Sequence, residues 1–167
     1  MSITRSTVRI AVFIGAATFA AGAAVAQTAH ILVPADKVQW GPAPPILPAG
    51  AQIAVLAGDP TKGVPYTVRL KFPANYAIPA HSHPTDENVV VTTGALTLGM
   101  GDKLMKGGTA DKTLSAGGYA LMPANMNHFA YTTNEETTVV LYGIGPVDFK
   151  YVNPSDDPRT ASKQTRK

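Results

Sequence analysis

Residues 75–94 read NYAIPAHSHPTDENVVVTTG and contain two short extended stretches joined by a tight turn. Because residues two apart in a strand share a face, His81 and His83 present both imidazoles to one point. A proline and a threonine follow His83 and turn the chain, and Glu87 begins the second stretch. The segment therefore predicts a β-hairpin that brings a carboxylate back beside two imidazole rings.

His128 lies far along the chain, after the turn at residues 122–125, and begins a strand that can pair back against this hairpin. Three neutral imidazoles and one carboxylate satisfy Mn, Fe, Ni, Co, Zn or Cu, and they leave two positions of a six-coordinate ion open. The chain has no cysteine, so any metal site must use nitrogen and oxygen ligands. We predict one divalent ion, Mn or Fe by preference, on His81, His83, Glu87 and His128.

Two nearby residues are weaker candidates for this site. Asp86 is the alternative carboxylate, but strand alternation turns it outward if Glu87 faces the histidines, and we prefer Glu87. His30 lies in a segment without another metal-ligating residue nearby, and a single histidine is more often structural or exposed than a ligand. We expect no role for His30.

Short runs with period-two alternation recur along the chain and predict an all-β fold. The clearest is residues 66–72, in which tyrosine, valine, leucine and phenylalanine alternate with polar residues. Gly, Pro, Asn and Asp separate the runs, as in an antiparallel sandwich or barrel. The Gly-rich segment 99–118 is interpreted as a long hairpin between two halves. The strands are expected at residues 52–57, 66–72, 77–83, 87–92, 95–99, 119–122, 128–131, 137–142 and 147–152.

The N-terminal segment has the pattern of a signal peptide. Arg5 and Arg9 precede an uncharged run, residues 10–26, that ends in Ala-Val-Ala. A membrane anchor is the alternative, but the run is rich in Ala and Gly and falls short of the roughly 20 strongly apolar residues that a span needs. We expect residues 1–26 to be removed and the remainder to be exported and soluble, in the periplasm of a Gram-negative source.

The rest of the chain is long enough for one domain. Residues 27–50 form a lead-in whose four prolines favour an extended path, with Trp40 pinning it to the barrel. The barrel domain spans residues 51–153, and residues 154–167 form a polar, flexible tail.

The charge of the exported chain argues against nucleic acid as a partner. The whole chain has 14 Lys and Arg against 11 Asp and Glu, but two of the arginines lie in the signal peptide. The remainder is therefore nearly neutral, and it has no basic stripe interleaved with aromatic residues. We expect a small-molecule substrate or ligand, no nucleic acid, and no membrane contact after cleavage.

The residues around the histidines resemble the two motifs of the cupin family. The first motif, Gly-x5-His-x-His-x3–4-Glu-x6-Gly, corresponds to Asn75, His81, His83, Glu87 and Gly94. The second, Gly-x5-Pro-x-Gly-x2-His-x3-Asn, corresponds to Gly117, Pro123, Asn125, His128 and Thr132. Asn75 and Asn125 replace glycines, which is tolerable because Asn enters the left-handed backbone region more readily than most residues.

This resemblance extends over roughly residues 52–152 and implies a double-stranded β-helix, or jelly-roll, cupin barrel. It also implies metal ligation by the four residues named above and dimerisation through the outer strands, so a homodimer is expected. It does not fix the reaction, because one fold hosts many activities.

Two functions remain open from the sequence. The first is a metal-dependent enzyme with oxygenase-type chemistry on a small organic substrate, and the second is a non-catalytic metal or small-molecule binding or sensing module of the cell envelope. Tyr131 is the best candidate catalytic side chain because it follows His128 closely, although strict alternation turns it outward; Asn127 is weaker. Seven residues on strands near the ligands are candidates to line an apolar cavity, although plain barrel core is the favoured interpretation for most of them: Phe72, Val89, Leu98, Leu121, Met122, Phe129 and Tyr131.

Overall fold

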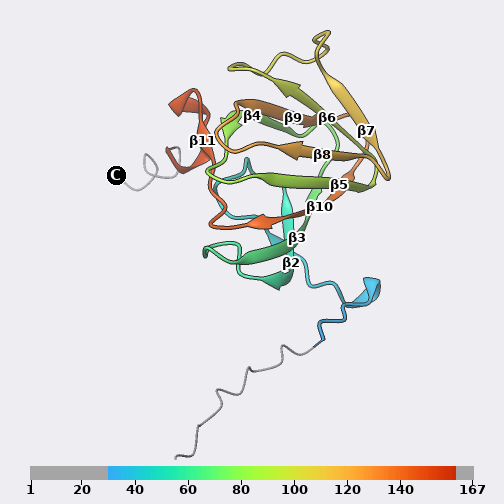
Figure 1. The fold of residues 1–167 in the computed structure, drawn as a ribbon. Helices are drawn as coiled ribbons and strands as arrows, with labels where there is room; N and C mark the ends of the chain where they lie inside the picture. The colour runs from blue at the N-terminus through green and yellow to red at the C-terminus, as the bar shows by residue number, and fades with distance from the viewer. Residues whose placement is uncertain (1–29, 161–167) are drawn as a thin grey trace, which may run out of the picture. The chain divides into compact units, whose positions relative to one another are not determined.

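The structure, a computed structural model, describes residues 30–160, and from residue 31 onward its strands form two antiparallel sheets (Figure 1). One sheet has the strand order β1-β2-β3-β10-β5-β8, and the other has the order β11-β4-β9-β6-β7. The strands are β1 (Gly41–Pro42), β2 (Gln52–Gly58), β3 (Pro65–Phe72), β4 (Ala77–Ser82), β5 (Glu87–Thr93), β6 (Ala95–Met100), β7 (Lys112–Ser115), β8 (Tyr119–Met122), β9 (His128–Thr132), β10 (Thr137–Ile144) and β11 (Lys150–Tyr151).

From β3 to β11 the chain changes sheets at every step except between β6 and β7, which form a hairpin within one sheet. This crossing back and forth is the topology of a jelly-roll barrel, and the predicted fold class is confirmed. The alternation expected over residues 66–72 is also confirmed, because Tyr66, Val68, Leu70 and Phe72 are buried while the residues between them are partly exposed.

Two segments differ from the sequence prediction. The strand expected at residues 147–152 is reduced to β11, because the backbone before it bonds elsewhere: Val147 N–H donates to Pro60 O at 2.7 Å, and Asp148 O lies 3.0 Å from His83 Nδ1. The Gly-rich segment 99–118, expected as a long hairpin, does form one with β6; the difference is the strand β7 within it, which was not predicted.

The lead-in is tied to the barrel at several points. Trp40 contributes, because Lys71 Nζ lies 4.6 Å from the centroid of its ring. Leu47 is buried in the core, and β1 pairs with β2. The hydroxyl groups of Tyr76 and Tyr151 donate to the carbonyl oxygens of residues 48 and 46, the second at 2.7 Å. The lead-in therefore forms part of the barrel wall.

Beyond β11 the chain forms the short 3-10 helix η2 (Pro154–Asp156), and η1 (Ala35–Lys37) lies in the lead-in. Within the segment predicted as a polar tail, Arg159 bonds to Asp148 Oδ1 at 2.8 Å and to Phe149 O at 2.6 Å. The expected signal peptide, residues 1–26, lies outside the described residues. No helix in residues 30–160 is long and apolar enough to cross a membrane.

Candidate metal centre

A β-bulge in β4 turns the histidines into the barrel. On β9, His128 and Ala130 are two residues apart and face the interior together; on β4, their partners His81 and Ile78 are three residues apart. The register shift between Ile78 and His81 accounts for the extra residue. Since a bulge reverses the alternation that follows it, a strand whose Ile78 points inward can also point His81 inward. Pro79 lies within the bulge and is the sequence signal for it.

His81, His83 and His128 form one buried group. Their ligand-capable nitrogen atoms lie within 4.8 Å of one another, and each side chain is at most 3% exposed. The ring of His81 lies 4.8 Å from that of His83 and 4.4 Å from that of His128, measured between centroids. The predicted convergence of the three imidazoles is therefore present in the structure.

The backbone fixes which ring nitrogen is available in each histidine. The Nδ1 atoms of His81, His83 and His128 lie 2.7, 3.0 and 3.0 Å from the carbonyl oxygens of Pro79, Asp148 and Met126. A carbonyl oxygen only accepts, so Nδ1 must carry the proton, and in the neutral ring Nε2 is then a lone-pair donor. This arrangement orients imidazoles for metal binding.

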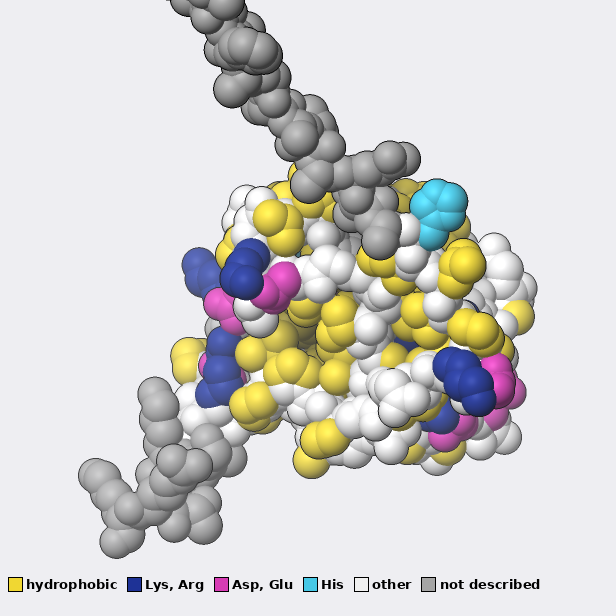
Figure 2. All heavy atoms as spheres, turned by 90° about the horizontal axis from the view of Figure 1, so that it is seen from below, with side chains coloured by type: hydrophobic (Ala, Val, Ile, Leu, Met, Phe, Trp, Pro, Cys, Tyr) yellow, Lys and Arg dark blue, Asp and Glu magenta, His cyan; other side chains and the backbone are white. Residues whose placement is uncertain are grey.

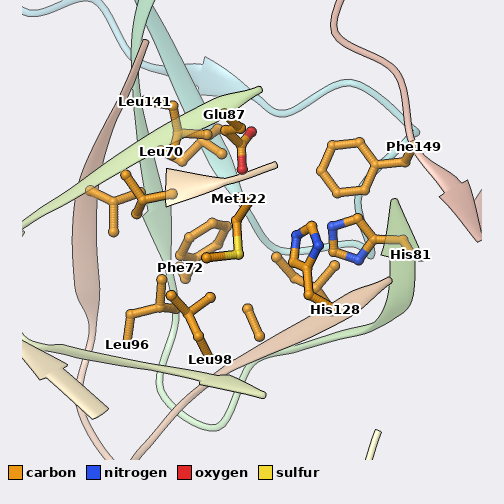
Figure 3. Close-up of a pocket in the computed structure, with 14 residues that line it drawn as sticks. Leu70, Phe72, His81, Glu87, Leu96, Leu98, Met122, His128, Leu141 and Phe149 are labelled. Atoms are coloured by element: carbon orange, nitrogen blue, oxygen red, sulfur yellow. The ribbon is translucent and has the colours of Figure 1, made fainter. Parts of the chain in front are cut away.

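Glu87, the first residue of β5, lies beside the three histidines. Its Oε2 is 3.5 Å from His83 Nε2, and the side chain is buried. Figure 3 shows its carboxylate pointing into the same cavity as His81 and His128. Among the described residues, Glu87 Oε1 and His83 Nε2 have no hydrogen-bond partner, although both are buried. A buried nitrogen such as His83 Nε2 is costly without a partner, and a cation between it and Glu87 Oε2 would supply one, so this donor set fits a divalent metal ion.

The protonation states agree with that fit. Burial first, and then the neighbouring His128 and His83, lower the pKa of His81 well below its ordinary value. Burial likewise lowers the pKa of His128 to about 4. These imidazoles are therefore neutral and available as ligands at neutral pH. Burial raises the pKa of Glu87, which means that its charged form lacks stabilisation without a cation nearby.

Phe149 covers the histidines. Its ring stacks on His81 with centroids 4.4 Å apart and meets His83 edge-on at 4.5 Å. The cavity beside the histidines is about 30 Å³, enough for about one water-sized molecule. Phe149 is not predictable from the sequence, because residues 147–152 have the pattern of a strand; its position depends on the turn before β11, which no local pattern reveals.

Several predicted residues lie elsewhere. The structure does not bring Tyr131 to the histidines: its hydroxyl donates to Asp111 Oδ2 at 2.8 Å and accepts from Gly107 N–H at 3.1 Å. Asn127 donates to Asp102 at 2.7 Å. Asp86 is exposed and accepts from Ala124 N–H at 2.8 Å, and His30 is exposed.

The predicted cavity lining is correct in part. Phe72, Val89, Leu98 and Met122 line the cavity beside the histidines, whereas Leu121, Phe129 and Tyr131 do not. Leu121 is largely exposed because it lies on the opposite face of β8 from Met122.

The left-handed positions predicted at the two motif asparagines are confirmed. Asn75 has a φ of 59° and Asn125 a φ of 61°. The N–H of Asn125 donates to His83 O at 2.8 Å, so this turn contacts the strand end that carries the ligand. Thr132, at the last motif position, is buried and hydrogen-bonded to Pro73 O at 2.7 Å.

Comparison with known proteins places this geometry in a family. The sequence profile of the family described as "ChrR Cupin-like domain" matches residues 28–148. No curated protein matches the chain. Similar solved structures include KdgF from Halomonas sp., with 20% identity over 71% of this chain and 96% of that one and a TM-score of 0.53.

The polyketide cyclase RemF from Streptomyces resistomycificus is similar at 16% identity, with 68% and 78% of the two chains covered and a TM-score of 0.53. An RmlC-like cupin from Shewanella frigidimarina has 14% identity, coverage of 68% and 89%, and a TM-score of 0.50. At these identities the likeness is one of fold.

Proposed function

Because the chain belongs to the ChrR cupin-like family, we propose that it is a metal-dependent enzyme with oxygenase-type chemistry on a small organic substrate. One divalent ion would be held by His81, His83, His128 and Glu87. The observation that carries the proposal is the set of three Nδ1 contacts to backbone carbonyl oxygens, which leaves three Nε2 atoms without a proton in one buried group.

Glu87 is the fourth ligand in this proposal. Two ligand atoms in adjacent positions at about 2.1 Å from an ion lie roughly 3.0 to 3.4 Å apart, and His83 Nε2 and Glu87 Oε2 are separated by 3.5 Å. The carboxylate also supplies the negative charge that offsets part of the charge of a divalent cation. Asp86 is turned to the surface and its carboxylate is engaged by Ala124.

The ligand set suits Mn or Fe best in our proposal, although Zn, Ni, Co and Cu also accept imidazole nitrogen and carboxylate oxygen. When bound, the ion supplies Lewis-acid or redox chemistry. The chain's own contribution is to hold the imidazoles neutral and oriented, and to keep bulk water out through Phe149 and the apolar interior.

The test compares metal forms of the protein. We expect the Fe or Mn form to consume dioxygen with a small aromatic or enolisable compound, while the Zn form and a His81→Ala variant do not. A broad substrate screen in which every metal form is equally inactive would reject the enzyme and leave the binding module.

That second function, a non-catalytic metal or small-molecule binding or sensing module of the cell envelope, is favoured by one observation. Phe149 stacks directly on His81 and leaves only about 30 Å³ beside the histidines. A Phe149→Ala variant that opens this space separates the two functions. Faster metal exchange without any substrate turnover supports binding, and turnover with a broadened substrate range supports the enzyme.

We also propose a homodimer. The outer face of the six-stranded sheet exposes four large apolar side chains on β8 and β10, namely Tyr119, Leu121, Tyr142 and Ile144. An apolar group of this kind favours contact with a second copy of the same face. Light scattering of the full barrel should give a dimer, and Ile144→Asp should give a monomer; a monomeric wild type would reject the proposal.

Export is proposed from the sequence pattern of residues 1–26 alone. N-terminal sequencing of protein expressed with this segment in a Gram-negative host should give a chain that begins at Gln27 in the periplasmic fraction. Recovery of the uncleaved chain from the cytoplasm would reject it.

A further inference from the structure

A second, larger cavity lies next to the one beside the histidines. It has a volume of about 190 Å³ and lies between β2, β3 and the lead-in, with Ile46, Ile53 and Val68 among the apolar side chains that line it. Figure 2 shows the face of the barrel on the side of β2 and β3, where hydrophobic side chains gather around a hollow. The two cavities share four lining residues, among them Glu87 and Phe149. A molecule in the larger cavity therefore lies against the wall of the metal centre.

The larger cavity contains two polar groups that lack a partner. Glu87 Oε1 is buried without a hydrogen bond, while Oε2 faces His83. Tyr66 is 4% exposed, and among the described residues its hydroxyl makes no hydrogen bond. Thr61, the other polar residue in the lining, is already bonded to Asp59 at 2.6 Å. Since buried polar groups are normally paired, the unpaired Glu87 Oε1 identifies the place where a ligand's polar group would bind, and the Tyr66 hydroxyl lies in the same lining.

The chemistry of these two groups restricts the ligand. A carboxylate only accepts hydrogen bonds, and the tyrosine hydroxyl, with Glu87 occupied, is left to donate. A hydroxyl group satisfies both at once, whereas an ammonium group cannot accept and a carboxylate is repelled by Glu87. The apolar walls exclude further charge.

We infer that this cavity binds the organic substrate of the proposed enzyme, and that the substrate is a small, mostly apolar molecule with one hydroxyl group, such as a simple phenol or cyclic alcohol. Its hydroxyl donates to Glu87 and accepts from Tyr66, at the boundary with the metal centre. An apolar cavity of about 150 Å³ holds benzene, so this one takes roughly six to ten non-hydrogen atoms. The inference rests on the proposed function for the word substrate, but binding can be measured without turnover.

The experiment uses the zinc-loaded full barrel, 4-ethylphenol, and its analogue without a hydroxyl, ethylbenzene, with affinities measured by calorimetry. We expect 4-ethylphenol to bind about 3- to 10-fold more tightly than ethylbenzene, the range for one net hydrogen bond. Tyr66→Phe should lower this preference by at least about twofold, because the hydrogen bond from Tyr66 is lost while the one to Glu87 remains, and it should leave ethylbenzene binding unchanged because the ring remains in place.

A filling substitution tests the location. Val147→Phe adds volume to the cavity lining and should weaken both probes at least tenfold, whereas Val140→Phe, on the outer face of β10, is the matched control and should change neither. Ile46→Phe, in the lead-in, gives a second filling variant if Val147→Phe loses its sheet circular dichroism.

The outcomes separate this inference from the proposed function. Zinc at one per chain with no binding of either probe would reject the cavity while leaving the metal site intact. Binding of 4-ethylphenol by a chain that takes up no metal would support the cavity and reject the proposed enzyme. Equal affinity for the two probes in the wild type would show that the hydroxyl assignment is wrong.

Discussion

Strand β9 carries a buried polar side chain at each end, and the two differ in how many of their polar atoms are hydrogen-bonded. Thr132 and His128 are both 2% exposed. Thr132 Oγ1 donates to Pro73 O at 2.7 Å and accepts from Tyr76 N–H at 2.9 Å, so its hydroxyl is satisfied. His128 uses only Nδ1, which is bonded to Met126 O, and its Nε2 faces two other imidazoles. A fully bonded polar group stabilises the fold, whereas a half-bonded one is free to bind something else.

The largest expected effect tests this contrast directly. We expect His128→Ala to lower bound metal well below one per chain, a loss of affinity of at least about 100-fold, because it removes one of only four ligands. Thr132→Val should keep metal near one per chain but lower the free energy of unfolding by about 1 to 3 kcal/mol, since Tyr76 N–H and Pro73 O lose their partner.

Elemental analysis measures the bound metal of both variants, and urea unfolding measures their free energy of unfolding. His30→Ala is the control and should change neither quantity. If His128→Ala retained a full equivalent of metal, the half-bonded histidine would not be a ligand and the contrast would fail.

The next effect compares two neighbouring carboxylates. Glu87→Gln should weaken metal binding roughly 10- to 100-fold, because the buried side chain loses its negative charge but keeps its shape. Asp86→Asn should change it much less, since Asp86 is exposed and bonded to Ala124 N–H. Competition with a chromophoric chelator at fixed pH measures both, and equal losses would contradict the assignment of Glu87.

The sequence predicts the apolar wall of the barrel and the hairpin that carries the ligands, but it does not predict the bulge that turns His81 inward. The alternation at residues 66–72 predicts the apolar wall, and the spacing of His81, His83 and Glu87 predicts a hairpin that gathers them. The bulge at Pro79 could not be placed from alternation, because a one-residue slip reverses every side chain beyond it. The same alternation places Tyr66 on the face of Val68 and Leu70, but nothing in a local pattern shows that its hydroxyl makes no hydrogen bond within residues 30–160.

A third prediction concerns the pH dependence of the metal-free protein. His128 has a pKa of about 4 in the folded state against 6.5 when unfolded, so between these values the unfolded chain binds more protons. The contribution of His128 to the free energy of unfolding is complete above pH 6.5. It is lost as the pH falls toward 4, and the loss is about 2 kcal/mol at pH 5. His81 acts in the same direction.

Glu87 changes the stability with pH in the opposite direction. Its pKa is raised above 4.5 in the folded state, so its contribution to the free energy of unfolding is lost as the pH rises. Comparison with His128→Gln, which keeps Glu87, isolates the histidine. The wild type should lose about 4 to 8 °C more in melting temperature between pH 7 and pH 5 than this variant does. Identical profiles would mean that His128 is not buried as a neutral ring.

The smallest expected effect compares the two left-handed asparagines, one at each end of the barrel. Near the end of β9 that carries Thr132, Asn75 N–H donates to Thr133 O at 2.6 Å. Near the end that carries His128, Asn125 N–H donates to His83 O at 2.8 Å. Because a left-handed backbone is unfavourable for alanine, Asn75→Ala and Asn125→Ala should each lower the free energy of unfolding by about 1 kcal/mol.

Only Asn125→Ala should also weaken metal binding, by about threefold, because its turn holds His83 through this bond and lies next to Met126, whose carbonyl orients His128. Asn125→Gly, which accepts the same backbone angle, should restore the affinity. Chelator competition on the three variants provides the measurement. If Asn75→Ala weakened metal binding as much as Asn125→Ala, the two ends of the barrel would be coupled, and the separation between a structural end and a binding end would be lost.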